Sequence, residues 1–345
     1  MDCKNKLWRI TLDTNPEDCN YHCIMCEEHS EYSHFKDELY KTTGCKHRRM
    51  PVEWLDSIMK EAARLGVTEV IPSTMGEPLL YNGIDEFFEC VKRYGLVVNL
   101  TTNGSFPRKP IETWTKVIVP ITRDVKVSIN GAKKETSESI MRGSSFDTQL
   151  FNIGTLVQER DKHFAEKGWY CSVTLQLTFM QCNMGELVDI VRLACELGVD
   201  RIKGHHLWAH FGAIKNLSMK ESPDSIAKWN EYVRQTNEAC DKYARPLPNG
   251  KRLRLENVVP LVETKGEIIP DDYVCPFLGR ELWISATGQI SPCCCPNDKR
   301  QTLGDFGRFP ETTLSDVLKN TEYRKLLSDY KTRDVCKTCN MRRRQ

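Results

Sequence analysis

The sequence predicts an α/β protein with a parallel sheet, because strand-like runs alternate with helix-like stretches over the first two thirds of the chain. The strand-like runs are short and rich in apolar residues, and the stretches between them carry apolar residues at three- and four-residue spacing. Strands joined by helical crossovers form a parallel sheet that is wound right-handed. The predicted strands are Leu7–Leu12, Val67–Pro72, Val97–Thr102, Val125–Ile129, Ser172–Phe179 and Arg201–Leu207. The predicted helices are Pro51–Leu65, Ile84–Tyr94, Phe146–Lys162 and Met184–Leu197.

The alternation stops after the sixth predicted strand. Residues 209–274 contain a helical stretch, Pro223–Tyr243, followed by the turn Arg245–Gly250. Proline and glycine in that turn end the helical pattern. We therefore expect residues 209–274 to form a helical bridge to a separate C-terminal unit.

Composition limits the classes of function. The chain has 49 basic and 47 acidic residues, so no strong overall field favours nucleic acid as a partner. No run approaches the roughly eighteen apolar residues of a membrane span, and the N-terminus has no apolar signal segment. Sixteen cysteines in such a chain fit metal ligands, catalytic thiols or buried small residues better than disulfides. These features predict a cytoplasmic protein.

Three cysteines lie within eight residues, in the run Cys19-Asn-Tyr-His-Cys23-Ile-Met-Cys26. Iron–sulfur cubanes normally take four cysteine ligands. A compact loop with three thiolates therefore predicts a cluster with one iron open to a small molecule. The alternative is a zinc knuckle, although zinc sites favour a C-x2-C pair with two further ligands.

This cysteine spacing resembles that of the radical S-adenosylmethionine (SAM) enzymes. The resemblance implies a [4Fe–4S] cluster on Cys19, Cys23 and Cys26, with SAM bound at the open iron and an external electron donor. It also implies release of a 5′-deoxyadenosyl radical. The expected fold becomes a partial (β/α)6 TIM-like barrel over residues 1–208, with the chemistry at the carboxyl ends of the strands.

Further segments match the same family where its strands end. Thr74-Met-Gly-Glu-Pro78 resembles the Gly-Gly-Glu-Pro turn that holds the SAM amino group, with Met75 in place of the first glycine. Glu77 is expected to accept hydrogen bonds from that ammonium. An ordinary turn is the alternative here, and a solvated helix residue is the alternative for Arg142. The residues implied to contact SAM or substrate are Met75, Gly76, Glu77, Pro78, Thr102, Asn103, Ser128, Asn130, Arg142, Gln176 and Asn183.

A second cysteine set lies near the C-terminus. Cys275 is followed after twelve residues by Gly288 and after four more by Cys293, and Cys336-Lys-Thr-Cys339 completes the set. This spacing resembles the twitch form of the SPASM domain and implies one auxiliary [4Fe–4S] cluster, because only six residues follow Cys339. Cys294 and Cys295 leave the second ligand open, and a zinc ribbon is the alternative.

The resemblance places this auxiliary domain at residues 275–345. Within it we expect a hairpin of the strands Glu281–Ser285 and Gln289–Ser291, and then a helix over Thr313–Tyr330.

Two other cysteines are candidates for donating a hydrogen atom to a substrate radical, as a peptide epimerase requires. Cys182 lies just past the fifth predicted strand, and Cys45 lies in an insertion after the cysteine loop. No neighbouring residue marks either thiol as reactive, so a structural role is the alternative.

The insertion, Glu27–Met50, mixes aromatic and cationic residues close to the expected radical. It is either a surface loop or a clamp for an extended polymer such as a peptide. The residues after the sixth strand that are expected to line the same pocket are His205, His206, Trp208 and His210.

The cysteine-loop sequence resembles that of peptide maturases of the epimerase and splicease kind. The predicted reaction is hydrogen abstraction from a ribosomally made precursor peptide, which leads to epimerisation, cross-linking or backbone excision. Only eighteen residues precede Cys19, so a separate leader-peptide recognition protein is the expected partner. The alternatives are oxidation, epimerisation or decarboxylation of a sugar or aminocyclitol, and a metal-binding module without SAM chemistry.

Overall fold

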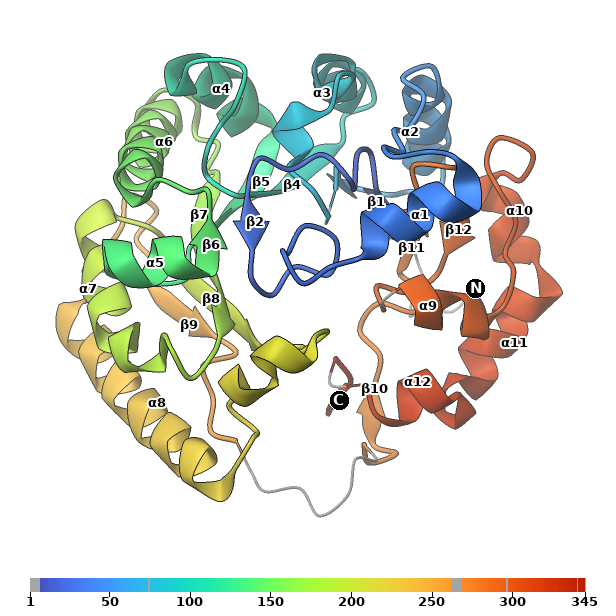
Figure 1. Ribbon diagram of the computed structural model, residues 1–345. Helices are drawn as coiled ribbons and strands as arrows, with labels where there is room; N and C mark the ends of the chain where they lie inside the picture. The colour runs from blue at the N-terminus through green and yellow to red at the C-terminus, as the bar shows by residue number, and fades with distance from the viewer. Residues whose placement is uncertain (1–6, 74, 262–268, 296, 340, 345) are drawn as a thin grey trace.

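A nine-stranded sheet forms the frame of the molecule (Figure 1). The computed structural model describes residues 7–73, 75–261, 269–295, 297–339 and 341–344. The strand order is β12-β11-β1-β3-β4-β5-β7-β8-β9, and every neighbouring pair is parallel except β11 with β12. The strands are β1 (Arg9–Leu12), β3 (Glu69–Ile71), β4 (Val97–Thr102), β5 (Thr122–Ser128), β7 (Ser172–Phe179), β8 (Arg201–His206), β9 (Arg254–Glu256), β11 (Glu281–Ile284) and β12 (Ile290–Ser291). The predicted partial parallel barrel is confirmed.

Helices surround the outer face of this curved sheet (Figure 1). The four helices predicted for the barrel and the helix predicted at Pro223–Tyr243 are all present. Five short α-helices of the described residues were not predicted: α1 (Phe35–Thr43), α4 (Ile111–Ile118), α5 (Lys134–Ile140), α9 (Asn297–Arg300) and α12 (Asp334–Lys337). The expected helices occur as α2 (Trp54–Arg64), α3 (Ile84–Arg93), α6 (Phe146–Lys167), α7 (Leu187–Leu197) and α8 (Pro223–Tyr243).

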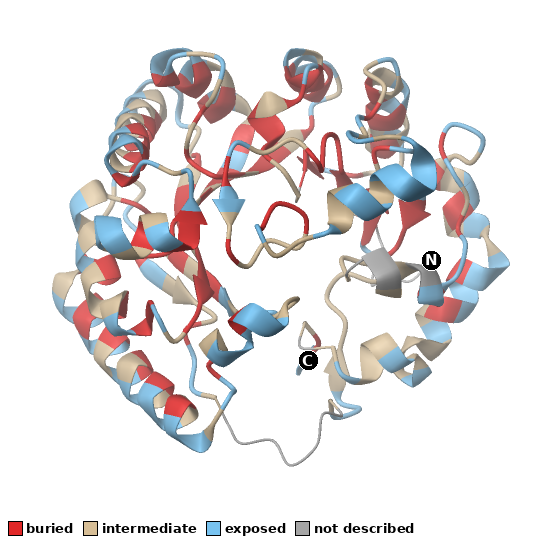
Figure 2. Ribbon diagram, viewed as in Figure 1, coloured by how far each residue is buried: buried red, intermediate tan, exposed pale blue. Residues whose placement is uncertain are grey.

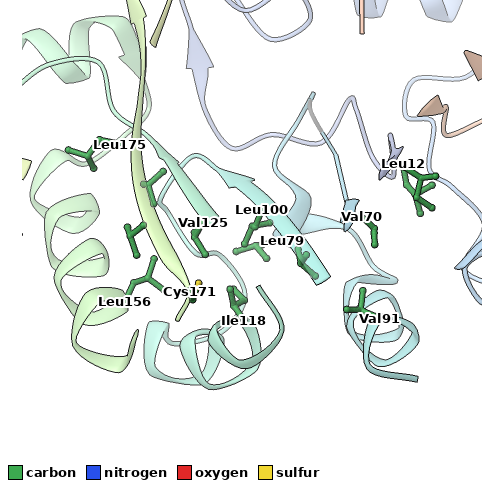
Figure 3. Close-up of a cluster of buried hydrophobic side chains, with 14 of the residues drawn as sticks. Leu12, Val70, Leu79, Val91, Leu100, Ile118, Val125, Leu156, Cys171 and Leu175 are labelled. Carbon is green, nitrogen blue, oxygen red and sulfur yellow. The ribbon is translucent and has the colours of Figure 1, made fainter. Parts of the chain in front are cut away.

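The core lies between the strands and these helices, because alternate strand residues point to opposite faces. Figure 3 shows Leu100, Val125 and Leu175 from three neighbouring strands turned toward Ile118 of α4 and Leu156 of α6. All five side chains are fully buried. Burial of each aliphatic side chain in this layer contributes about 1.5–3 kcal/mol to folding.

The other strand residues point into the barrel and divide into two levels. At the amino ends of the strands they form an ionic network, in which Arg9 pairs with Glu69 at 2.6 Å and Arg201 with Glu256 at 2.7 Å. Lys126 is buried in this network beside Asp124, and burial lowers its pKa to about 8. The amino end is thus closed by paired charges, and the open interior lies at the carboxyl ends.

The C-terminal segment extends the barrel sheet. Strand β11 pairs in parallel with β1, with Arg9 opposite Glu281 and Leu12 opposite Ile284. Strand β9, from the predicted bridge, pairs with β8 at the other edge. The C-terminal unit that was expected to be separate therefore continues the barrel sheet. Its strand β11 supplies hydrogen-bond partners to the backbone of β1, which would otherwise be an open edge of the sheet.

The single helix predicted over Thr313–Tyr330 is wrong. The segment forms two helices, α10 (Leu314–Lys319) and α11 (Thr321–Asp329). Asn320 between them is extended, and its side chain accepts hydrogen bonds from the backbone N–H groups of Glu322 and Tyr323. A side chain that caps a new helix in this way competes with continuation of the old one.

Candidate active site between two cysteine clusters

The three-cysteine loop leaves the carboxyl end of β1 and lies over the open end of the barrel. Backbone N–H groups point at two of its sulfurs: Tyr21 N donates to Cys19 Sγ and His29 N to Cys26 Sγ, both at 3.4 Å. The Asn103 amide donates to Cys19 Sγ at 3.8 Å. Donors aimed at sulfur stabilise a negatively charged ligand set and tune an iron–sulfur cluster.

Burial raises the pKa of the Cys19 and Cys23 thiols and raises that of Cys26 to about 11. Neighbouring thiolates raise the pKa of Cys23 further. A buried thiolate is costly unless a metal neutralises it. The chemistry and burial of these donors therefore fit an iron–sulfur cluster.

A cavity of about 220 Å³ adjoins the loop. Its wall brings together the three cysteines and most of the residues predicted to contact SAM. They come from the carboxyl ends of four neighbouring strands, which explains how positions far apart in the sequence share one cavity. The predicted residues on this wall are Met75, Gly76, Thr102, Asn103, Ser128, Asn130 and Gln176.

Gly76 is required by a close approach between two backbones. Its φ is +69°, and a Cβ there would lie 2.5 Å from the carbonyl oxygen of Asn15 and 2.7 Å from that of Asp18. Only glycine tolerates both conditions. The turn that includes Gly76 is thereby held against the segment that enters the cysteine loop.

Glu77 lies behind the wall of this cavity. Its side chain is fully buried and is absent from the cavity wall. One carboxylate oxygen accepts from Thr102 Oγ1 at 2.9 Å, and the other accepts from Asn103 N at 2.7 Å. Burial raises its pKa to about 7. Glu77 thus joins two walls of the cavity, and Pro78 beside it begins the short 3-10 helix η2 (Pro78–Leu80).

Arg142 and Asn183 also lie off the cavity wall. Arg142 is exposed in β6 (Met141–Arg142) and pairs with Glu31. Asn183 is buried, and its amide donates to the carbonyl oxygens of Asn130 and Thr178. Its role is to brace the strand ends. Thr74 of the predicted turn lies outside the described residues.

The two candidate hydrogen donors lie apart from this cavity. Cys182 is exposed in the turn after β7, and Cys45 is half-buried beyond α1, where its thiol donates to the carbonyl oxygen of His47 at 3.2 Å. Neither thiol lines a cavity described here.

The C-terminal cysteines converge from three separate segments. Burial, and then the negative charge of the neighbouring thiolates, raises the pKa of Cys275, of Cys339 and of Cys336, the last to about 12. Cys293 acts in this way on each of the other three. Four thiols that repel one another as anions form a donor set for a cationic iron–sulfur core.

Within the cysteine triplet, Cys293 has the most acidic thiol. The thiols of Cys294 and Cys295 donate hydrogen bonds to it, which lowers its pKa well below the usual range of a thiol, and Cys295 N donates to its sulfur at 3.4 Å. The same contacts raise the pKa of Cys294 and Cys295. The geometry thus favours Cys293 as the fourth ligand.

A larger cavity, of about 480 Å³, lies between the smaller cavity and the C-terminal cysteines. Met75 and His205 line both this cavity and the smaller one. At the far end the wall contains Cys293, Cys294 and Cys339. We name this space the central cavity.

Aromatic and charged side chains form the walls of the central cavity. Arg300 pairs with Asp13 at 3.5 Å and lies over the Trp283 ring at 4.4 Å. Lys299 lies 5.0 Å from the centre of the Trp208 ring and makes no ion pair with any described residue. The predicted residues His205, His206, Trp208 and His210 all line this cavity.

The buried Glu28 and the half-buried His206 on this wall have strongly shifted pKa values. Burial raises the pKa of Glu28 to about 9 and lowers that of His206 to about 4, so both side chains favour their neutral forms. Glu28 Oε2 has no hydrogen-bond partner among the described residues.

Sequence reasoning missed Glu28, Trp283, Lys299 and Arg300. Trp283 had a usable signal, since its two neighbours on β11, Leu282 and Ile284, face the core and strand alternation places it inside the barrel. The other three lie in loops or short helices without such a period.

The part of the chain that the structure describes contains neither a single-metal site nor a membrane-spanning helix. No three His, Cys, Asp or Glu side chains there are close enough to hold a single metal ion. Within the same residues, no helix combines the length and the apolar run that a membrane span requires.

Comparison with known families yields two matches. Residues 16–162 match the family model of the Radical SAM superfamily, and residues 275–340 match that of the SPASM iron–sulfur cluster-binding domain. The two matched segments contain all seven predicted cluster cysteines.

Two curated relatives are GTP 3′,8-cyclases. The enzyme of Clostridium perfringens is 23% identical over 341 residues, which cover 95% of this chain and 87% of the relative. A probable GTP 3′,8-cyclase of Thermococcus kodakarensis is 27% identical over 192 residues. That match covers 55% of this chain and about half, 53%, of the relative.

Solved structures share the fold at low identity. Streptococcus suis SuiB bound to S-adenosylmethionine has a TM-score of 0.66 at 14% identity, covering 97% of this chain and 72% of SuiB. SuiB bound to precursor peptide SuiA has a TM-score of 0.63 at 14% identity, covering 97% and 71%. Native anSMEcpe with bound AdoMet and Cp18Cys peptide has a TM-score of 0.62 at 14% identity, covering 96% and 86%.

Proposed function

We propose that this chain, which carries a radical SAM domain followed by a SPASM iron–sulfur domain, is a radical SAM enzyme that modifies a precursor peptide held in the central cavity. The observation that carries the proposal is the position of that cavity, which shares two wall residues with the smaller cavity beside the first cysteine loop and is lined by C-terminal cysteines at its far end. A substrate there lies next to the SAM cavity through Met75 and His205, and next to the auxiliary cysteines at the other end.

Each part of the site has a distinct task in this proposal. Cys19, Cys23 and Cys26 hold the SAM-cleaving cluster, and Cys275, Cys293, Cys336 and Cys339 hold the auxiliary one. When bound, the first cluster and SAM supply a 5′-deoxyadenosyl radical that takes a hydrogen atom from the substrate. The residues that line the smaller cavity orient SAM, among them Gly76, Asn103 and Gln176.

Two other side chains hold the walls of the cavities in place. Glu77 joins Thr102 and Asn103 to the turn before η2, so it sets the distance between two sides of the SAM cavity. The half-buried His206 packs against Phe179 and Trp229, with ring centroids 5.6 and 4.8 Å away. This apolar support keeps the neutral imidazole and the cavity wall in place and excludes water.

The charges of the central cavity favour a peptide over a nucleoside triphosphate. Arg48 is bound to Glu17, its Nε donating at 2.7 Å, and Arg300 is paired with Asp13. Among the described residues of the wall, Lys299 is thus the one lysine or arginine without an ion pair. The same wall also carries the carboxyl groups of Glu27 and Glu28, the second of which lies 4.0 Å from Arg48. A triphosphate requires several free cations, whereas a peptide segment with little net charge does not.

Peptide-bound structural neighbours support the same reading. SuiB binds precursor peptide SuiA and anSMEcpe binds the Cp18Cys peptide, and both have this fold. Nucleotide cyclisation is the second candidate, because the curated relatives are GTP 3′,8-cyclases that align with much of the chain. A separate leader-recognition protein and an external electron donor complete the proposal.

The test uses anaerobically reconstituted protein with SAM and dithionite. One reaction receives the short peptides encoded by neighbouring genes, and a second receives GTP. We expect a peptide to take up deuterium from heavy water, lose hydrogen or lose a backbone segment, with GTP unchanged. Conversion of GTP without any change in a peptide would replace the proposal by the cyclase function.

A further inference from the structure

Helix α1 lies on the surface and buries none of its side chains. None of its nine residues is buried, and Figure 2 shows it in the colours of exposed and intermediate residues. A short helix gains most of its stability from packing an apolar face. This face of α1 therefore calls for an explanation.

The groove-facing residues of α1 have helical spacing. Phe35, Glu38, Leu39 and Thr42 follow the i, i+3, i+4, i+7 pattern and line one side of a groove of about 330 Å³. The opposite side comes from the β11–β12 hairpin. Its lining residues are Ser285, Thr287, Gln289, Ile290 and Ser291. We name this space the α1 groove.

The α1 groove adjoins the central cavity. Arg48, Ser285 and Arg300 line both spaces, and we call the boundary that these three residues mark the passage. The path from the exposed face of α1 to the central cavity therefore runs past these residues.

Polar contacts hold α1 in place beside this path. The Arg48 backbone N donates to Glu17 Oε2 at 2.6 Å, its side chain binds the other oxygen of Glu17, and its guanidinium lies 5.5 Å from the centre of the Phe35 ring. Phe35 N also donates a hydrogen bond to Ser33 Oγ at 3.1 Å. The helix is thus anchored without its groove-facing residues being covered.

We propose that the α1 groove binds the extended segment of the peptide substrate that flanks the modified residue. This inference rests on the proposed function, because a small molecule would fit within the central cavity alone. The hairpin wall offers hydroxyl and amide groups for a peptide backbone, and Phe35 and Leu39 offer an apolar contact for a side chain. The arginines at the passage are already paired, so the chemistry suits a segment with little net charge.

The test uses reconstituted, SAM-loaded protein and a displayed library of short random linear peptides as the probe. Leu39→Glu places a charge on the groove face, and Lys41→Glu places the same charge on α1 outside the groove. Neither side chain is buried, so both variants should retain their iron and their substrate-free SAM cleavage. Peptides selected on the wild type should bind Leu39→Glu at least about tenfold more weakly and Lys41→Glu equally well.

The outcomes separate the two proposals. Peptides that compete for the central cavity but bind Leu39→Glu as tightly as the wild type would overturn the α1 groove and leave the peptide maturase intact. If no peptide is retained while GTP binds and is converted, the proposed function fails, and the groove assignment fails with it.

Discussion

The two cysteine clusters are built in opposite ways. The first comes from one loop of eight residues, Cys19 to Cys26, directly after β1. The second draws Cys275, the triplet at Cys293 and the pair at Cys336 and Cys339 from separate segments, placed by the pairing of β11 with β1. The proposed SAM-cleaving half of the site is therefore local in sequence, whereas the proposed auxiliary half forms only in the folded chain.

This difference indicates that losing a ligand of one cluster should affect different steps of the reaction from losing a ligand of the other. A local loop loses its cluster when one ligand is lost, but the barrel core behind it does not depend on that ligand. The distributed set shares its supporting strands with the central cavity, since Trp283 of β11 lines that cavity. A substitution among the auxiliary cysteines should therefore reduce product formation more than it reduces SAM cleavage.

The largest effect is expected for Cys23→Ala. Loss of one of three local thiolates removes the first cluster, so 5′-deoxyadenosine formation should become undetectable and iron content should fall from about eight to about four per chain. Iron analysis and chromatography of the dithionite-driven reaction measure both. Cys45→Ala is the matched control and should keep both values; normal cleavage by Cys23→Ala would refute the assignment of the loop.

Cys336→Ala should separate the two clusters. We expect it to keep SAM cleavage, to lose about four irons and to form no product, because the auxiliary set lies at the other end of the central cavity. Parallel assays of 5′-deoxyadenosine and of product measure this split. Full product formation by this variant would contradict an auxiliary cluster at these cysteines.

The cysteine triplet offers a finer comparison. Cys293→Ser should lose the auxiliary cluster, whereas Cys294→Ser and Cys295→Ser should retain most of its iron, because Cys293 alone interacts with all three of the other ligand thiols. Iron counting and the visible absorbance of the cluster distinguish the three variants. Equal loss in Cys294→Ser would move the ligand within the triplet.

Gly76→Ala should destabilise the local site to a moderate extent. Its positive φ and the 2.5 Å approach to the Asn15 carbonyl oxygen predict a loss of about 1–3 kcal/mol in the free energy of unfolding, together with weaker SAM binding. Chemical denaturation and SAM titration measure these quantities. Gly154→Ala, on exposed space in α6, is the control and should be neutral or stabilising.

The smallest effect concerns pH. Burial raises the pKa of Glu77 to about 7, so the folded state binds more protons than the unfolded state between about pH 4.5 and 7. The free energy of unfolding should therefore fall as pH rises through this window. Glu77→Gln removes this contribution, and denaturation curves across the window should show a flatter slope; an unchanged slope would show that Glu77 is not the group responsible.

Much of the fold was predictable from local pattern. The bounds of β4, β7 and α8 agree with the predictions, because long apolar periods and clear turn residues bracket them. Helices α4 and α5 escaped prediction because eight and seven residues carry too few turns to show a period. The break at Asn320 was not predicted, because a capping asparagine within an amphipathic stretch looks like any other polar residue on the exposed side of a helix.

The candidate site divides in the same way. The sequence by itself determined the α/β class, the radical SAM and SPASM resemblances and most of the positions that meet at the SAM cavity, because residue spacing and strand alternation are short-range properties. Only the tertiary structure decided that Glu77 is buried behind Thr102 and Asn103, that Arg142 pairs with Glu31 and that the central cavity adjoins both the smaller cavity and the C-terminal cysteines. Those outcomes depend on packing between segments far apart in the chain, whose free energy is a sum over many weak contacts that no local pattern records.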